Sequence, residues 1–284
     1  MLKAVPAIAF AVAAVAAPSV ARSTHPFKNI PVVTVHAKEF AFVSPPTIAP
    51  GQVTIRLVND GKQLHHITVL KLEKGKTFAD FEKGLKANKL DPATLTSVGG
   101  PNAAVPGSTI EATLTLEPGN YVIACFIPSP GEETPHAMKG MYKSLVVSAG
   151  GVQQAGSATA AAPVPDTHLE LKDYTFKLSK PLTAGKHTIH VMNAAAQDHE
   201  VVLVRLAPGK HATDFSSWAM TGMKGPPPAM PMAGMAALAK DRTGVFTENF
   251  TPGTYGIVCF VSDAKDHKPH AEHGMTAEFT VAAK

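Results

Sequence analysis

The chain has 284 residues, a formal net charge of +4 at pH 7, and many prolines (24) and glycines (22) but few aromatic residues (6%). This length predicts two domains of ordinary size. Because the positive charge is weak and not clustered, a nucleic-acid partner is not expected. The abundance of turn-forming residues favours an all-β protein over a helical one.

The first residues have the features of an export signal. Lys3 precedes an Ala/Val-rich run at 4–17, and Ser19-Val20-Ala21 has the small residues of a cleavage site. We therefore expect residues 1–21 to be a signal peptide and the mature chain to be periplasmic or extracellular. The apolar run is too short to span a bilayer well and no later stretch is long enough, so no membrane span is expected in the mature chain.

The first half, residues 22–148, reads as a series of short strands and one helix. Thr77 and Asp80 resemble a capping box, which predicts a helix with Phe78, Phe81 and Leu85 on one face. Alternating and β-branched runs bounded by turn residues predict strands at 32–35, 39–42, 53–58, 65–70, 109–116, 121–126 and 143–148.

The second half, residues 166–284, repeats this order after a Gly-, Ala-, Ser- and Pro-rich segment at 149–165, which we interpret as a linker. Strands are expected at 169–171, 174–178, 187–193, 199–206, 247–250, 255–260 and 277–281. The Met- and Pro-rich stretch 220–235 is interpreted as a loop with packing methionines, although thioethers also favour Cu(I). The repeated order indicates a tandem duplication, and strands without βαβ alternation predict a Greek-key sandwich in each half.

One stretch occurs twice, at residues 119–141 and 253–275. Each copy has a Tyr, a Cys four residues later, then ten residues, a His, and Gly-Met beginning four residues after it. An earlier His follows an Asn after five intervening residues in both halves, at Asn59 and Asn193. The repeated donor residues are therefore His65, Cys125, His136 and Met141 in the first half, and His199, Cys259, His270 and Met275 in the second.

These donors are soft ligands, and a His–Cys–His set with a weak Met is the set of a blue-copper site. The chain has only two cysteines, and an exported protein can pair two cysteines in a disulfide. The repeat argues against that pairing, because each Cys holds the equivalent interior place of its own half.

On these residues the sequence resembles the cupredoxins, the plastocyanin and azurin family, over nearly the whole mature chain. The resemblance implies two tandem Greek-key cupredoxin-like β-sandwiches, each with a short helix and each binding copper. It also implies three equatorial ligands and one axial Met in each half: His65, Cys125 and His136 with Met141, and His199, Cys259 and His270 with Met275. The chain departs from the family in its longer Cys-to-His spacing, and in having His66 and Glu200 where Asn often follows the early His.

The function predicted from this resemblance is a secreted copper-binding electron-transfer protein with one type 1-like site per half and a redox protein as partner. Two alternatives stay open: copper delivery or sequestration by the same ligands, and a metal-free cupredoxin-like interaction module. Multicopper oxidases and copper nitrite reductases have a His beside the Cys, whereas Ala124 and Phe126 flank Cys125 here. Hydrolase and phosphate-loop motifs are also missing from the sequence, so the sequence-based prediction is that the protein is not an enzyme.

Overall fold

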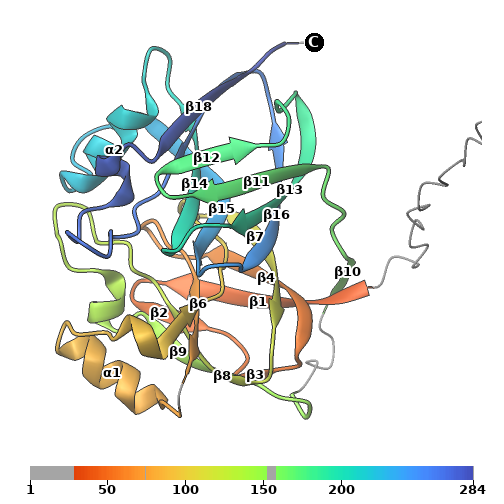
Figure 1. Cartoon of the computed structure of the whole chain (residues 1–284), viewed down its shortest axis with the longest axis vertical. Helices are drawn as coiled ribbons and strands as arrows, with labels where there is room; N and C mark the ends of the chain where they lie inside the picture. The colour runs from red at the N-terminus through yellow and green to blue at the C-terminus, as the bar shows by residue number, and fades with distance from the viewer. Residues whose placement is uncertain (1–28, 74, 152–157, 284) are drawn as a thin grey trace, which may run out of the picture.

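A computed structural model describes residues 29–73, 75–151 and 158–283 (Figure 1). The expected signal peptide at 1–21 lies outside the described residues. None of the helices in the described part of the chain combines the length and apolarity that crossing a bilayer requires.

One large sheet runs through both halves of the chain (Figure 1). Its two halves have the same plan: a parallel pair next to an antiparallel strand, β1 with β4 and β7 in the first half, and β11 with β13 and β16 in the second. The two plans join where β7 meets β16, at Thr113 opposite Val245. The strand order is β10 (Thr159–Ala161), β1 (Asn29–Lys38), β4 (Gly51–Asn59), β7 (Thr109–Leu116), β16 (Thr243–Phe250), β13 (Gly185–Asn193), β11 (Thr167–Lys172) and β12 (Thr175–Leu178), and β2 (Ala41–Val43) pairs with β1.

Each half adds a second sheet of its own, and these smaller sheets carry the repeated Cys motif. The first has the order β3 (Thr47–Ile48), β9 (Tyr142–Val147), β8 (Gly119–Ala124), β5 (Thr68–Leu72) and β6 (Leu95–Ser97). The second has the order β15 (Ala229–Leu238), β14 (His199–Leu206), β17 (Gly253–Val258) and β18 (Thr276–Val281).

The main core draws buried side chains from both halves into one contiguous cluster. Leu57 and Ile123 belong to it from the first half, and Val191 and Ile257 from the second. Burial of this apolar surface is the main favourable contribution to folding, so the two halves share a source of stability. Both cysteines lie in this cluster as free, buried thiols, so the disulfide disfavoured by the repeat is indeed not formed.

A short helix covers the outer face of each small sheet, at the two ends of the molecule (Figure 1). Helix α1 (Phe78–Lys86) begins at the predicted capping box, in which the Thr77 hydroxyl accepts from the Asp80 N–H, and it buries Phe81 and Leu85. Helix α2 (Ala212–Met220) buries Phe215 against the second sheet. The described residues also contain three single-turn helices: η1 (Pro92–Thr94), η2 (His136–Lys139) and η3 (His270–His273).

The mostly β architecture with a helix in each half is confirmed. The arrangement as two tandem Greek-key sandwiches is not confirmed, because the first sheets of the halves are joined through β7 and β16 and share the main core. Within the expected linker, β10 pairs with β1 from Asn29 to Pro31. An irregular linker would leave this edge of β1 without hydrogen-bond partners. The pairing with β10 supplies partners for the backbone of β1 instead.

The interpretation of 220–235 as a loop is wrong for its second part. Residues 229–238 form β15, which pairs along β14 and buries Met235 completely. Pro and Gly in this stretch hid its strand character from the sequence pattern. The strand tolerates its Pro and Gly because the register of its pairing with β14 is irregular. The register shifts, as at a β-bulge, between His199 and Val201 and again between Leu203 and Val204.

Candidate metal centres

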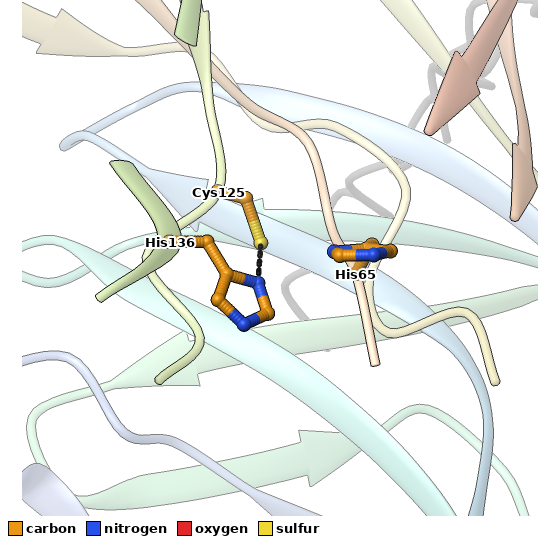
Figure 2. A group of neighbouring side chains, drawn as sticks. All are labelled: His65, Cys125 and His136. Atoms are coloured by element: carbon orange, nitrogen blue, oxygen red, sulfur yellow. Dashed lines mark hydrogen bonds between the residues drawn. The ribbon is translucent and has the colours of Figure 1, made fainter. Parts of the chain in front are cut away.

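Two fully buried clusters of potential metal ligands lie among the described residues, one in each half. The first contains His65, Cys125 and His136, and Figure 2 shows His65 arriving from a different chain segment than the other two. In each cluster the three donor atoms lie within 4.8 Å of one another, and all six side chains are fully buried. The second cluster contains His199, Cys259 and His270.

Backbone hydrogen bonds clamp the Cys and the late His together despite the ten residues between them. Cys125 directly follows β8, and its carbonyl accepts the N–H of Ala137 at 2.7 Å, next to His136 in η2. The Met141 carbonyl accepts the N–H of Cys125 at 3.1 Å, and the Met141 N–H donates to the His136 carbonyl at 2.9 Å. The intervening residues therefore form a separate loop, and its length does not affect the convergence of the ligands.

The second half repeats this clamp. The Cys259 carbonyl accepts the N–H of Ala271 at 2.9 Å, and the Met275 N–H donates to the His270 carbonyl at 3.0 Å. Met141 and Met275 are both fully buried. The backbone thus places each predicted axial Met directly beside its Cys and late His.

The repeated Asn explains how the early His is held. The Asn59 side chain donates to the carbonyls of Gln63 and Ala104 at 2.8 and 2.9 Å, and His65 N–H donates to the same Ala104 carbonyl at 3.1 Å. Asn193 makes the equivalent bonds to Gln197 and Leu238, both at 2.7 Å. The Asn closes the five-residue turn and fixes where the following His enters the core.

Several imidazole nitrogens in the clusters have no hydrogen-bond partner. Within the described residues, both ring nitrogens of His65 and Nε2 of His270 are buried and unpaired. Unpaired buried polar atoms are rare and require an explanation such as a missing ion. Nδ1 of His136 and Nδ1 of His270 each lie 3.5 Å from the neighbouring Cys Sγ, and Nδ1 of His199 lies 3.8 Å from Cys259 Sγ. This donor set fits a soft metal ion.

Burial sets the protonation of the candidate ligands. It lowers the pKa of His65, His136 and His270 to about 4, so these rings are neutral at pH 7 and can ligate through a lone pair. Burial also lowers the pKa of His199, against the opposing effect of Asp173. In the metal-free site burial raises the pKa of Cys125 to about 12, and it raises the pKa of Cys259 as well. A coordinated metal ion reverses this effect, because it deprotonates a ligating thiol.

The residues that contact the outer faces of the imidazoles were missed by the sequence reasoning. Nε2 of His136 donates to Gln63 Oε1 at 3.0 Å, and Nε2 of His199 donates to Asp173 Oδ1 at 3.0 Å. Asp263 lies 3.9 Å from Nε2 of His270, and hydrogen bonds, above all from Tyr174, hold the pKa of its carboxyl well below its usual range. Such partners orient metal-ligating histidines.

A signal for these outer residues was present in the repeat. Lys-Glu-Phe at 38–40 and Lys-Asp-Tyr at 172–174 hold equivalent places in turns between paired strands. The ring of Phe40 lies against His136 with centroids 5.2 Å apart, and that of Tyr174 lies against His270 at 5.5 Å. An aromatic wall therefore covers the late His in both halves.

His66 and Glu200, which follow the early His in the two halves, connect the ligand segments. His66 Nε2 accepts the N–H of Phe126 at 2.8 Å, and Glu200 Oε1 accepts the N–H of Phe260 at 2.9 Å. Each bond ties the residue after the early His to the residue after the Cys. His66 and Glu200, which replace the Asn found in the family, therefore still link the segment of the early His to the segment of the Cys.

Comparison with known proteins finds similarity at the level of three-dimensional structure only. No protein-family model and no curated protein sequence matches the chain. Auracyanin A, a "blue" copper protein from Chloroflexus aurantiacus, is 24% identical, with a TM-score of 0.30 over 41% of this chain and 99% of that one. A copper nitrite reductase from Nitrosomonas europaea is 16% identical, with a TM-score of 0.25 over 89% of this chain and 94% of that one. A multicopper oxidase is 13% identical, with a TM-score of 0.25 over 88% of each chain.

The similar structures named above are thus a cupredoxin and two multicopper-type enzymes. At this identity and TM-score the likeness assigns no function, and only the two clusters point to a bound metal. The prediction that the protein is not an enzyme is contradicted, because copper enzymes are among these similar structures. The lack of a His beside either Cys removes one electron route and does not exclude catalysis.

Proposed function

We propose that the protein binds one copper ion in each half and uses the pair of ions to carry single electrons. The observation that supports this most directly is the repeated convergence of buried His, Cys and His donors within 4.8 Å of one another. A single such cluster is explained equally well by core packing. Two clusters in equivalent places, with unpaired imidazole nitrogens, favour ligation.

The chemistry of the donors favours copper among the metals that bind Cys and His. A thiolate and two imidazoles with a weak thioether suit the trigonal site of electron-transfer copper, whereas structural zinc prefers four strong ligands in a tetrahedron. In this proposal His65, Cys125 and His136 would hold the first ion, and Met141 would supply a weak thioether contact. His199, Cys259, His270 and Met275 do the same for the second.

The surrounding residues suit a redox ion. Copper, when bound, supplies one-electron chemistry between Cu(II) and Cu(I). The clamp at Met141 and the bonds through His66 hold the ligand segments in place, which limits rearrangement when the charge of the ion changes. Complete burial of the donors excludes water.

Titration of the purified, metal-free protein with Cu(II) tests this proposal. Two ions per chain should bind, with strong visible absorption from thiolate-to-Cu(II) charge transfer that disappears on reduction and returns on oxidation. Cys125→Ser and Cys259→Ser should each bind a single ion. Binding of Cu(I) with little colour would favour delivery or sequestration, and no binding would leave a metal-free interaction module.

The organisation and location of the chain are part of the same proposal. Residues 22–148 and 166–284 are the two repeat units, joined by 149–165, and removal of residues 1–21 accompanies export to the periplasm or cell exterior. There the carrier would exchange electrons with a redox protein. N-terminal sequencing of the protein from fractionated cells tests this, and a cytoplasmic chain that retains residues 1–21 would contradict it.

A further inference from the structure

A short segment of the first half, residues 97–104, passes between the two candidate metal centres and contacts both halves. On one side Ala104 N–H donates to the His65 carbonyl at 2.8 Å, and Ile67 N–H donates to the Pro101 carbonyl at 3.0 Å. On the other side the segment pairs with β15, where Gly99 N–H donates to Ala237 O at 2.9 Å. This crossing segment fixes the side chain of Asn102, which is 1% exposed, between the two sites.

Asn102 is the middle of a hydrogen-bonded chain that begins beside one Cys and ends beside the other. Phe126 N–H donates to His66 Nε2 at 2.8 Å, and His66 Nδ1 lies 3.2 Å from Asn102 Oδ1. Asn102 Nδ2 donates to Glu200 Oε2 at 2.9 Å, and Phe260 N–H donates to Glu200 Oε1 at 2.9 Å. Phe126 directly follows Cys125, and Phe260 directly follows Cys259.

The donors and acceptors of this chain match at every contact. His66 Nε2 accepts from Phe126, so in the neutral ring the proton is on Nδ1, which donates to the Asn102 carbonyl oxygen. The Asn102 amide then donates to Glu200, and the Glu200 carboxylate accepts at both oxygens. Because each partner can play only one role, the orientation of the Asn102 amide is determined on both sides. His66 and Glu200 are each 7% exposed, so the chain is shielded from water.

This series of hydrogen bonds gives a compact route between the sulfur atoms of the two cysteines. From each Cys the covalent path runs through Cβ, Cα and the carbonyl carbon to the amide nitrogen of the following Phe. The His66, Asn102 and Glu200 side chains each add only the two bonds that join their two polar atoms. A second contact shortens the route at the far end, since Glu200 N–H lies 3.4 Å from Cys259 Sγ.

We propose that the chain Phe126–His66–Asn102–Glu200–Phe260 is an electron-transfer path that connects the two copper sites, so that the halves act as one two-electron unit. This inference rests on the proposed copper binding. In each step one electron leaves the ion of one half, which goes from Cu(I) to Cu(II), and enters the ion of the other, which goes from Cu(II) to Cu(I). No covalent bond is made or broken and no further reactant is needed.

The environments of the two sites give this transfer a direction. The second site has carboxylates at both histidines, with Asp173 3.0 Å from His199 Nε2 and Asp263 3.9 Å from His270 Nε2. The corresponding contact at His136 in the first site is the uncharged Gln63. The first site has one carboxylate nearby, Glu39 beside His65, and it makes no hydrogen bond to that ring. Negative charge favours Cu(II) over Cu(I), so a single electron should settle in the first half.

A rapid one-electron reduction of the doubly loaded protein tests the path. The single-copper variants Cys125→Ser and Cys259→Ser supply the reference spectra of the two sites. In the unmodified protein the electron should redistribute toward the first site at a rate that does not depend on protein concentration. If electrons exchange only between molecules, or do not exchange at all, this experiment on the unmodified protein already overturns the proposal.

Asn102→Leu removes both side-chain hydrogen bonds and should slow the redistribution about tenfold or more, because an apolar side chain breaks the hydrogen-bonded network at two points. Asn102→Ser, which is smaller and cannot reach both partners, should do the same if the leucine variant does not fold. Val98→Ala is the control, since Val98 is a buried residue of the crossing segment and its side chain takes no part in the path; its rate should stay within about twofold.

Three further measurements separate an electronic role from a purely structural one. The visible spectrum and the potential of each site should be unchanged in Asn102→Leu, while hydrogen exchange at the Phe126 and Phe260 amides of the metal-free protein should become faster. Unmodified transfer rates in both Asn102 variants would overturn the proposal. Failure to load two copper ions would instead contradict the proposed function, so the two failures are distinguishable.

Discussion

Nε2 of His199 donates a hydrogen bond to Oδ1 of Asp173 at 3.0 Å, whereas the equivalent pair in the first half is not bonded in this way. Glu39, in the place of Asp173, accepts instead from the backbone N–H of Lys62, and both ring nitrogens of His65 have no partner among the described residues. The two candidate sites therefore have the same potential donors in different electrostatic surroundings, which should give them different copper affinities and potentials.

Replacing Asp173 by Asn keeps an acceptor oxygen for His199 and removes the charge. The second site should lose about tenfold in copper affinity, the lower end of the usual range for such partners, because the Asp173 side chain is 45% exposed and water screens its charge. Its potential should rise, since Cu(II) loses a nearby negative charge. Competition titration and potentiometry on the single-copper variant Cys125→Ser measure both quantities.

Glu39→Gln in the first half is the matched control, because Glu39 does not hydrogen-bond to His65. Its effect on affinity should be smaller than that of Asp173→Asn. Equal effects of the two substitutions on their own sites would show that the hydrogen bond to His199 has no special role.

The weak axial position is tested by Met141→Leu. Leucine fills a similar volume, so copper and its visible absorption should be retained. The potential of the first site should rise, because Cu(II), the more highly charged state, loses one donor and gains more apolar surroundings. Met138→Leu is the nearby control, since Met138 in η2 is 43% exposed. Loss of copper from Met141→Leu, or no change in potential, would contradict a weak axial contact.

The candidate site was predictable from the sequence to the extent that it is repeated. Cys125 with His136, and Cys259 with His270, hold the same register in two halves that differ elsewhere, and the Asn before the early His repeats as well. These residues depend on local backbone geometry, such as the turn closed by Asn59. A local pattern survives in a single sequence, so the residues that cluster could be identified without the fold.

The contacts between the halves were not predictable in this way. The pairing of β7 with β16, and the strand at 229–238, depend on which surfaces of the folded halves meet. Asn102 is an unremarkable residue in a Gly- and Pro-rich stretch until its amide is seen between His66 and Glu200. Sequence periodicity reports the faces of a single element, and it does not report long-range partners.

Copper should stabilise the protein measurably if the sites are formed as proposed. Binding to the folded state alone contributes about 2.7 kcal/mol per site when free copper is a hundredfold above the dissociation constant. Thermal unfolding should therefore move to higher temperature on loading and return after chelation. Cys259→Ser should show about half of the shift, and a shift of full size in this variant would mean that copper binds elsewhere.

Gly234 in β15 tests how closely the halves are packed around the crossing segment. A Cβ at this position would lie 1.9 Å from the Val201 carbonyl oxygen and 3.0 Å from that of Asn102, and its φ is +149°. Gly185 has a similar φ of +123° with no atom within 4 Å of a Cβ, so Gly185→Ala reports backbone strain alone, about 1–3 kcal/mol. Gly234→Ala should cost about 2 kcal/mol more, because the added methyl group forces the strands apart. Denaturant unfolding of the two metal-free variants measures the difference, and equal costs would contradict the close approach of β14, β15 and Asn102.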